Sequence, residues 1–355
     1  MQIRPKQKNT AALVISIILI VILLSCLMFY LLWYLPHSSQ PLSEPLDLSG
    51  TPQTEVQPAS PSFLPRLVEQ IKLFFNGLTG RAVCGNETQW TVLAVGIDYR
   101  GGDYLYGLAD VIRVARIDFT NQQVNVAAIP RNLLIQQPPQ RLDVTAPLLL
   151  NQSYFFGTPG MDYYQGSGYG AGALAATIQS NFDITAEHYV VVNFEAFVKF
   201  VDAIGGIEVD LPAPVDNLPT SFYPQGKQTL TGAQALELGR VREKYSDLQR
   251  IDNQTVILKG VLNKIKSPAI LAKLPAIYRA LKDSIVTDAT PDQVSSLICL
   301  AGKLEAQDVQ FFSPPQELLT PAMVYIPNLD AEMQVFQWDQ GLVDWLHQSL
   351  QAAKP

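Results

Sequence analysis

The chain has 355 residues, and its 32 acidic and 25 basic side chains give a formal net charge of −7 at pH 7. A surface of this overall sign has no general attraction for nucleic acid, so generic nucleic-acid binding is excluded. Any site for a polyanion must therefore be a local cluster of arginines. Once the N-terminal segments described next are set aside, roughly 270 residues remain, which is enough for one large domain or two small ones.

The N-terminal segment predicts a membrane anchor. Residues Ala11–Leu35 carry no charged side chain, and a helix needs roughly 20 apolar residues to cross a bilayer. Basic residues precede it at Arg4, Lys6 and Lys8, so we expect residues 1–10 to be cytoplasmic and the rest extracytoplasmic in a single-pass protein of the cell membrane. The alternative is a cleaved signal peptide. It is disfavoured because the apolar core exceeds the typical 7–15 residues, roughly, and no small-x-small cleavage site follows.

A linker and a short helix are expected next. Residues 36–65 hold seven prolines among Ser, Gln and Thr, a composition typical of an extended, semi-stiff extracytoplasmic tether. Within the connector of residues 66–89, Arg66–Gly77 has apolar side chains at helical spacing, which predicts an amphipathic helix. Cys84 and Cys299 would face an oxidising exterior, where they could pair or remain two buried thiols.

The folded domain is expected to begin near residue 90. Strands that alternate with helices predict the α/β class, with a mixed central β-sheet flanked by helices in an α-β-α sandwich. We assign the catalytic domain to residues 90–320 and treat 321–355 as a C-terminal extension. The predicted strands are Thr91–Ile97, Val111–Phe119, Val124–Ile129, His188–Phe194, Ile207–Leu211 and Val309–Phe312, and the predicted helices are Gly170–Phe182, Glu195–Ile204, Thr231–Val241, Asp247–Lys266 and Thr290–Leu304.

Two aspartates border the first strands of this domain. Asp98 ends an apolar strand, and Asp110 precedes the next strand after a glycine-rich loop. Ligands of open α/β sheets bind at strand ends, so the two carboxylates are expected to converge at one sheet edge. Mg²⁺ is commonly held by one or two carboxylates together with substrate phosphates, which makes this pair a candidate metal site. The alternative is turn chemistry, because Asp is common where strands end.

Arginines gather near the same acids and again about a hundred residues later. In the helix predicted from Asp247, the side chains of Asp247, Arg250 and Gln254 occupy positions i, i+3 and i+7 and share one face. Guanidinium groups hold phosphate oxygens through paired hydrogen bonds, so acids and arginines together predict a Mg²⁺-pyrophosphate site. The alternative is a solvated helix start with local ion pairs. The remaining arginines of the set are Arg100, Arg131, Arg240 and Arg242.

Polar and aromatic groups of the kind that line sugar sites follow in Asn151 and Tyr154. The loop from Gly157 to Gly172 is rich in glycine and tyrosine. It is expected to be a mobile lid or a glycan-contacting loop, or else a flexible linker.

Together these segments resemble the LytR-CpsA-Psr (LCP) family of cell-wall glycopolymer ligases, over roughly residues 91–266. The order and spacing of many motifs make the resemblance specific. The motifs are Gly96-Ile97-Asp98-Tyr99-Arg100, Ala109-Asp110, Ile129-Pro130-Arg131, Asn151 with Tyr154, His188–Phe194 with Phe197, Val201–Ile207, Leu230–Leu236, Arg240-Val241-Arg242, Asp247 with Arg250, and Gln254.

The resemblance implies an enzyme, a phosphotransferase that moves a glycopolymer from a polyprenyl-pyrophosphate carrier to peptidoglycan. It implies Mg²⁺ on Asp98 and Asp110, and a lipid tail in an apolar channel for which Phe194, Phe197, Val201 and Leu236 are candidates, with core packing as their alternative role. The implied catalytic residues are Arg131, Arg240, Arg242, Asp247 and Arg250. The implied substrate-binding residues are Arg100, Asn151, Tyr154, Gln254, Phe194 and Phe197.

The chain departs from the family pattern at three single positions and at Leu148-Leu149-Leu150, which replaces a basic or polar lead into the motif of Asn151 and Tyr154. Leu108, Asn132 and Asn253 stand where the family has an arginine, an aspartate and an arginine. These departures weaken phosphate binding and any base role at position 132. They leave two alternatives open: a polyprenyl-pyrophosphate hydrolase that uses water as acceptor, and a non-catalytic envelope regulator that binds lipid phosphate or glycan.

Overall fold

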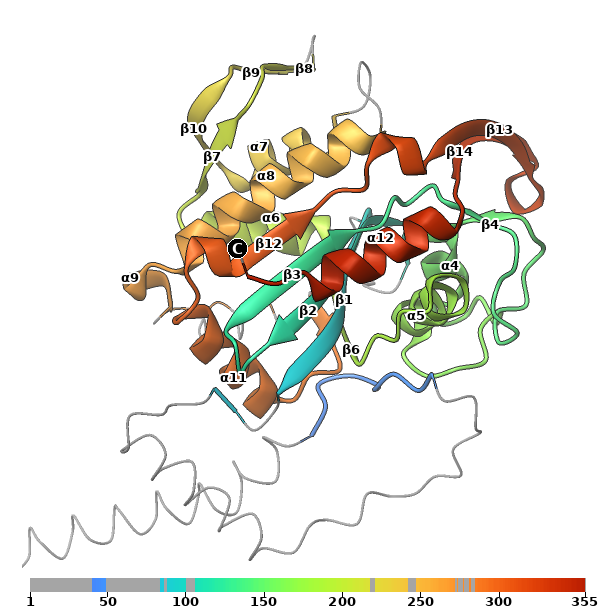
Figure 1. Cartoon of the computed structure of the whole chain (residues 1–355), viewed down its shortest axis with the longest axis horizontal. Coiled ribbons are helices and arrows are strands. Elements are labelled where there is room, and N and C mark those ends of the chain that lie inside the picture. Colours follow the sequence, from blue (N-terminus) through green and yellow to red (C-terminus); the bar gives the residue numbers. More distant parts are fainter. Residues whose placement is uncertain are drawn as a thin grey trace, which may run out of the picture.

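The computed structural model describes residues 40–48, 84–85, 88–99, 106–217, 221–241, 247–271, 273, 277, 281 and 285–354. A central sheet lies between helices in this part of the chain (Figure 1). The sheet has six strands in the order β11-β6-β1-β2-β3-β12. Its strands are β1 (Gln89–Ile97), β2 (Ala109–Asp118), β3 (Gln123–Ala128), β6 (His188–Asn193), β11 (Ile285–Thr287) and β12 (Val309–Phe312).

The sheet is mixed, as the sequence predicts. β1, β2 and β3 form an antiparallel meander, in which the predicted strands Val111–Phe119 and Val124–Ile129 pair as a hairpin. β6 runs parallel to β1, and β12 runs parallel to β3. β11 pairs antiparallel with β6 at one edge. Parallel pairs require crossover connections, and the helices between β3 and β6 provide one of them.

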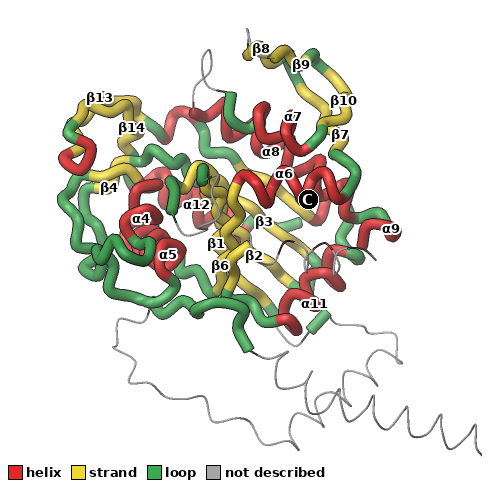
Figure 2. Tube along the Cα trace, turned by 180° about the vertical axis from the view of Figure 1, so that it is seen from behind, coloured by secondary structure: helices red, strands yellow, loops and turns green. Residues whose placement is uncertain are grey.

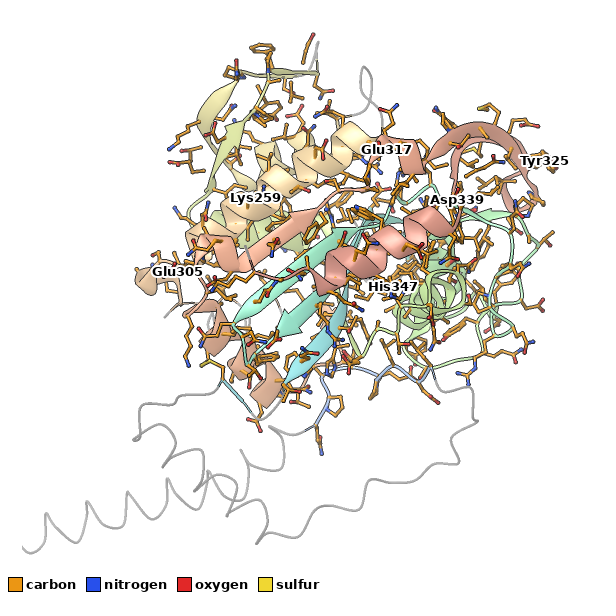
Figure 3. All side chains as sticks on the ribbon, in the orientation of Figure 1. Lys259, Glu305, Glu317, Tyr325, Asp339 and His347 are labelled. Carbon is orange, nitrogen blue, oxygen red and sulfur yellow. A yellow bond between two sulfur atoms is a disulfide. The ribbon has the colours of Figure 1, made fainter. Side chains whose placement is uncertain are left out.

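One face of the sheet packs on three helices: α4 (Leu150–Phe156), α5 (Tyr169–Phe182) and α12 (Gln340–Gln351). Leu93 and Val114 from the sheet meet Phe182 of α5 and Leu346 of α12 in the main apolar core. Figure 3 labels His347 on α12, whose Nε2 lies 2.9 Å from the carbonyl oxygen of Phe182. Residues 321–355, expected as an extension, therefore share the core of the domain.

The opposite face meets α11 (Pro291–Ala301) in a second cluster built on Trp90, Ile117 and Leu300. A third, smaller core lies beside the sheet and contains Val201 and Ile257. Figure 2 shows the elements of this third core from behind. They are α6 (Phe194–Ala203), α7 (Gly232–Leu238), α8 (Asp247–Ile265), β7 (Ile207–Leu211) and β10 (Gly226–Leu230).

The remaining elements are short or peripheral. A curved hairpin of β13 and β14 leaves Tyr325 on its outer side (Figure 3). The bounds are β4 (Leu134–Ile135), β5 (Leu148–Leu149), β8 (Val215–Asn217), β9 (Ser221–Tyr223), β13 (Thr320–Ile326), β14 (Ala331–Gln337), α9 (Pro268–Leu271), and the 3₁₀ helices Ala306–Asp308, Gln316–Leu318 and Pro327–Leu329.

Two features tie the segments before β1 to the domain. Cys84 and Cys299 form a disulfide, which resolves the alternatives left open by the sequence. Residues 40–48 of the predicted tether lie against the domain, where Leu46 and Leu48 pack on the main core. The hydroxyl of Tyr189 donates to the Glu44 carbonyl at 2.9 Å. Apolar side chains among the prolines explain why this part of the tether is bound.

The predicted membrane span and amphipathic helix, at 11–35 and 66–77, lie outside the described residues. Within the part of the chain that is described, no helix is both long and apolar enough to cross a membrane.

Candidate functional site

A β-bulge directs the side chain of Asp110 toward the site. Ile97 of β1 pairs with Ala109, and Gly96 pairs with Val111, so Asp110 is an extra residue in β2. In an unbroken strand Asp110 would share a face with Ile112 and the main apolar core, because side chains alternate. The bulge turns the side chain of Asp110 to the opposite face. Gly96 allows this close approach, since a Cβ there would lie 3.0 Å from the Cβ of Val111.

Asp110 belongs to a chain of ion pairs that joins three elements. Nη1 of Arg131, just after β3, contacts Oδ1 of Asp110. Nε of Arg131 lies 3.6 Å from Oδ1 of Asp247 at the start of α8, and Nη2 of Arg250 lies 3.2 Å from the same oxygen. The Asp247 carboxylate therefore bridges two guanidinium groups, and two acids alternate with two arginines.

Burial strengthens these pairs. The side chains of Asp110, Arg131 and Asp247 are 9%, 14% and 21% exposed, and that of Arg250 is 3% exposed. Charges held at such depth interact more strongly than they do in water. Because their orientations are already fixed, they can meet an anion without much rearrangement.

The first turns of α8 present three predicted side chains as the sequence indicates. Asp247 lies in the first turn, where a carboxylate suits the positive end of the helix dipole. Nε2 of Gln254 donates to the Gly239 carbonyl at 3.3 Å, so Gln254 fixes the turn that carries Arg240. The guanidinium carbon of Arg240 lies 5.0 Å from the ring centre of Phe194, a cation–π arrangement.

Asp98 lies at the end of β1 beside the same hairpin. Its Oδ1 accepts a hydrogen bond from the Leu108 backbone N–H at 2.8 Å, and its own N–H donates to the Leu108 carbonyl at 3.2 Å. The carboxylate thus performs the turn chemistry considered as its alternative role. One oxygen is engaged there, and a carboxylate has acceptor capacity for more partners. The predicted arginines Arg100 and Arg242 lie outside the described residues.

The other predicted contact residues are buried to different degrees. Asn151 is 3% exposed, and its backbone N–H donates to the Arg131 carbonyl at 2.9 Å, so it supports the loop that carries Arg131. Tyr154 is part of the main core, and burial raises the pKa of its hydroxyl. Phe194 starts α6 and is buried, while Phe197 is half-buried against the third core.

Sequence reasoning missed one charged residue near the site. Arg113 lies in β2, three positions after Asp110, and is 2% exposed. A lone arginine between Ile112 and Val114 was the available signal, because a charge in an apolar strand is costly to bury. Asn132 and Asn253, noted as departures from the family pattern, are 6% and 2% exposed.

The donor set fits a magnesium ion. Ile97 and Ala109 are paired residues, and each is followed directly by a candidate acid, Asp98 or Asp110. Two carboxylates with oxygen donors alone suit Mg²⁺, which fills its other positions with water and substrate phosphate. Among the described residues no group of three or more His, Cys, Asp or Glu side chains gathers as a metal cage.

The fold and the site define an α/β protein with a buried cluster of acids and arginines beside its central sheet, and the comparisons give its family. The LytR_cpsA_psr family profile matches residues 72–343. The chain therefore belongs to this family, as the motifs predict.

Named relatives match part of this chain in sequence. The polyisoprenyl-teichoic acid–peptidoglycan teichoic acid transferase TagU of Oceanobacillus iheyensis is 29% identical over 209 residues, which are 58% of this chain and 61% of that protein. TagV of Bacillus subtilis, with the same transferase name, is 24% identical over 60% of this chain and 53% of its own length. The matches thus span less than two thirds of these relatives.

Solved structures agree on the fold. The crystal structure of B. subtilis TagV aligns with a TM-score of 0.58 at 21% identity, over 75% of this chain and 97% of TagV. TagT bound to LIIa-WTA aligns with a TM-score of 0.56 at 19% identity, over 75% of this chain and 90% of TagT. The central mixed sheet flanked by helices is the fold of these proteins.

Proposed function

We propose that this protein is a membrane-anchored phosphotransferase that moves a glycopolymer from a polyprenyl-pyrophosphate carrier to peptidoglycan. The observation that carries the proposal is a buried chain of ion pairs in which two acids alternate with two arginines, in the order Asp110, Arg131, Asp247 and Arg250. Relatives named as teichoic acid–peptidoglycan transferases support it. The disulfide between Cys84 and Cys299 is consistent with a catalytic domain outside the cell, where oxidation favours such bonds.

The reaction needs little covalent work from the protein. An acceptor sugar hydroxyl attacks the phosphorus that carries the glycopolymer. The new P–O bond forms as the bond to the lipid phosphate breaks, polyprenyl phosphate leaves, and the hydroxyl proton passes to solvent. Positioning and charge neutralisation dominate such transfers. In this proposal Arg131 and Arg250 bind phosphate oxygens, and Arg240, Arg100 and Arg242 are further phosphate ligands.

In this proposal Asp98 and Asp110 hold Mg²⁺, which would neutralise charge on the pyrophosphate when bound. Asp247 orients the two arginines that it contacts. Gln254 positions the turn of Arg240, and Asn151 positions the loop of Arg131. Phe194 and Phe197 are offered as contacts of the lipid carrier.

The proposal is tested with the full-length chain in detergent, a synthetic polyprenyl-pyrophosphoryl sugar, peptidoglycan fragments and Mg²⁺. Release of polyprenyl phosphate that requires both Mg²⁺ and the acceptor, and that is lost in Asp110→Asn, is the expected result. Release that is equally fast without peptidoglycan would instead identify a hydrolase. Tight lipid binding with no release would identify a non-catalytic regulator, in line with the departures at Leu108, Asn132 and Asn253.

A further inference from the structure

One buried arginine, Arg113, lies on the strand of Asp110 but is not a member of the ion-pair chain of Asp110, Arg131, Asp247 and Arg250. Arg113 is in the middle of β2 and is 2% exposed. Its neighbours directly across the sheet are Ala94 of β1 and Ala128 of β3. These small side chains share its face and leave room for a guanidinium group. By the alternation that follows the bulge, Arg113 lies on the same face as Asp110.

Arg113 connects the strand of Asp110 to the helix of Arg250. Its Nη2 donates to the Ile251 carbonyl at 3.0 Å, across 138 positions of sequence. Ile251 directly follows Arg250 in α8. The second terminal nitrogen, Nη1, is buried and has no hydrogen-bond partner among the residues that the structure describes. Nη2 of Arg113 thus joins β2 to α8, whereas Nη1 makes no hydrogen bond to the described residues.

The Ile251 carbonyl has a second donor besides Arg113. The Ile251 carbonyl also accepts the Thr255 hydroxyl at 2.9 Å, so it keeps a partner without Arg113. Burial lowers the pKa of Arg113 to about 10, while the charge of Asp252, an exposed residue, acts in the opposite direction. The side chain therefore remains a cation at neutral pH. Burying a charge without a close ionic partner opposes folding, so a stabilising role does not explain it.

We propose that Arg113 is a positioning residue of the phosphate site, which holds Arg250 and Asp247 against the strand that carries Asp110. Through the Ile251 carbonyl it fixes the first turns of α8. Its charge also adds a positive potential behind the arginines that meet the pyrophosphate. Fixed charges of this kind favour the charge that develops during transfer and need no reorganisation. This inference rests on the proposed phosphotransferase function.

The test compares three variants of the full-length chain in detergent: Arg113→Met, Arg113→Lys and Arg116→Met. Met has similar length without the charge, and Lys keeps the charge. Arg116 is the matched control, because it lies on the same strand and bonds to Thr91. For each protein, Tm is measured, together with kcat and KM for the polyprenyl-pyrophosphoryl sugar at saturating Mg²⁺ and peptidoglycan.

Arg113→Met is expected to keep or raise Tm, to lower kcat about 10–100-fold, and to change KM about threefold at most, as for residues that orient ligands from behind. Arg113→Lys should recover a large part of kcat, and Arg116→Met should match the parent. A parallel loss of Tm and kcat in Arg113→Met, with no recovery in Arg113→Lys, would mean that Arg113 is only structural.

The outcomes separate this inference from the proposed function. If the parent protein shows no acceptor-dependent turnover, the phosphotransferase proposal fails and the role of Arg113 fails with it. If the parent turns over and Arg113→Met equals Arg116→Met, only the role of Arg113 is overturned.

Discussion

Asp247 is the residue on which the geometry of the site depends most. One of its oxygens lies 3.2 Å from Arg250 and 3.6 Å from Arg131. A carboxylate between two cations holds both in place, so that in the proposed function the pyrophosphate would meet arginines that are already ordered. At this scale the site is an arrangement of charges whose partners come from three separate elements.

Arg250→Met should weaken binding of polyprenyl pyrophosphate about 10–100-fold, because a charge-assisted hydrogen bond contributes about 1.5–3 kcal/mol. Arg116→Met removes a guanidinium from the same protein, at a position bonded to Thr91 and Gln89, and should leave the affinity unchanged. Titration of each protein with the lipid in detergent gives the dissociation constants. Equal losses in the two variants would show that Arg250 does not contact the phosphates.

Residue spacing predicted part of the site and left part out. Helical spacing brought Asp247, Arg250 and Gln254 to one face without any knowledge of tertiary structure. Nothing in the sequence near Asp110 indicated a bulge, because a bulge depends on register with the partner strand. Arg113 was overlooked for a similar reason, since the carbonyl it bonds, that of Ile251, is 138 positions away.

Among the elements, the β1–β2 pair controls the direction of Asp110. The pairing of Gly96 with Val111 brings their backbones together just where the register shifts. A side chain at position 96 would meet the Cβ and Cγ2 atoms of Val111 at 3.0 and 3.1 Å. The bulge therefore depends on the absence of a side chain at position 96.

Gly96→Ala should lower the free energy of unfolding by about 1–3 kcal/mol, the usual range for overpacking. It should also slow turnover, because the strand must shift at Asp110. Urea unfolding and the transfer assay measure the two effects. Addition of Val111→Ala should restore part of both, since it removes the Cγ2 contact while the Cβ contact remains. A double variant no better than Gly96→Ala would contradict this description of the bulge.

Secondary structure was largely predictable where periodicity was clear. The strand expected at Val309–Phe312 has those same bounds, and the helix expected at Asp247–Lys266 ends one residue earlier, at Ile265. In the tether, the proline-rich composition predicted an extended linker, although Leu46 and Leu48 within it pack on the main core. Those leucines pack on a core assembled from distant elements, which local sequence does not show.

At the scale of the whole molecule, the disulfide joins the segment before β1 to α11 over a sequence separation of 215 residues. Cys84 is buried with Trp90 and Leu300 in the cluster under α11. A crosslink over so long a loop restricts the unfolded chain, and disulfides of this kind stabilise proteins by roughly 2–5 kcal/mol.

Replacing both cysteines, in Cys84→Ser with Cys299→Ser, should therefore lower Tm by about 5–15 °C. The parent protein should show the same change when it is heated with dithiothreitol, and the double variant should not respond to the reductant. Scanning calorimetry with and without reductant measures the shift. A Tm that is the same in all four samples would mean that the disulfide does not stabilise the domain.

The central proposal, transfer of one phosphate with the glycopolymer, is tested most directly by the fate of labelled phosphorus. Two donors are prepared, one labelled in the phosphate next to the sugar and the other in the phosphate next to the lipid. Each is incubated with the full-length chain, Mg²⁺ and peptidoglycan. We predict that the sugar-side label appears in peptidoglycan and the lipid-side label in polyprenyl phosphate. Sugar-side label recovered only as soluble sugar phosphate would contradict the transfer and indicate hydrolysis.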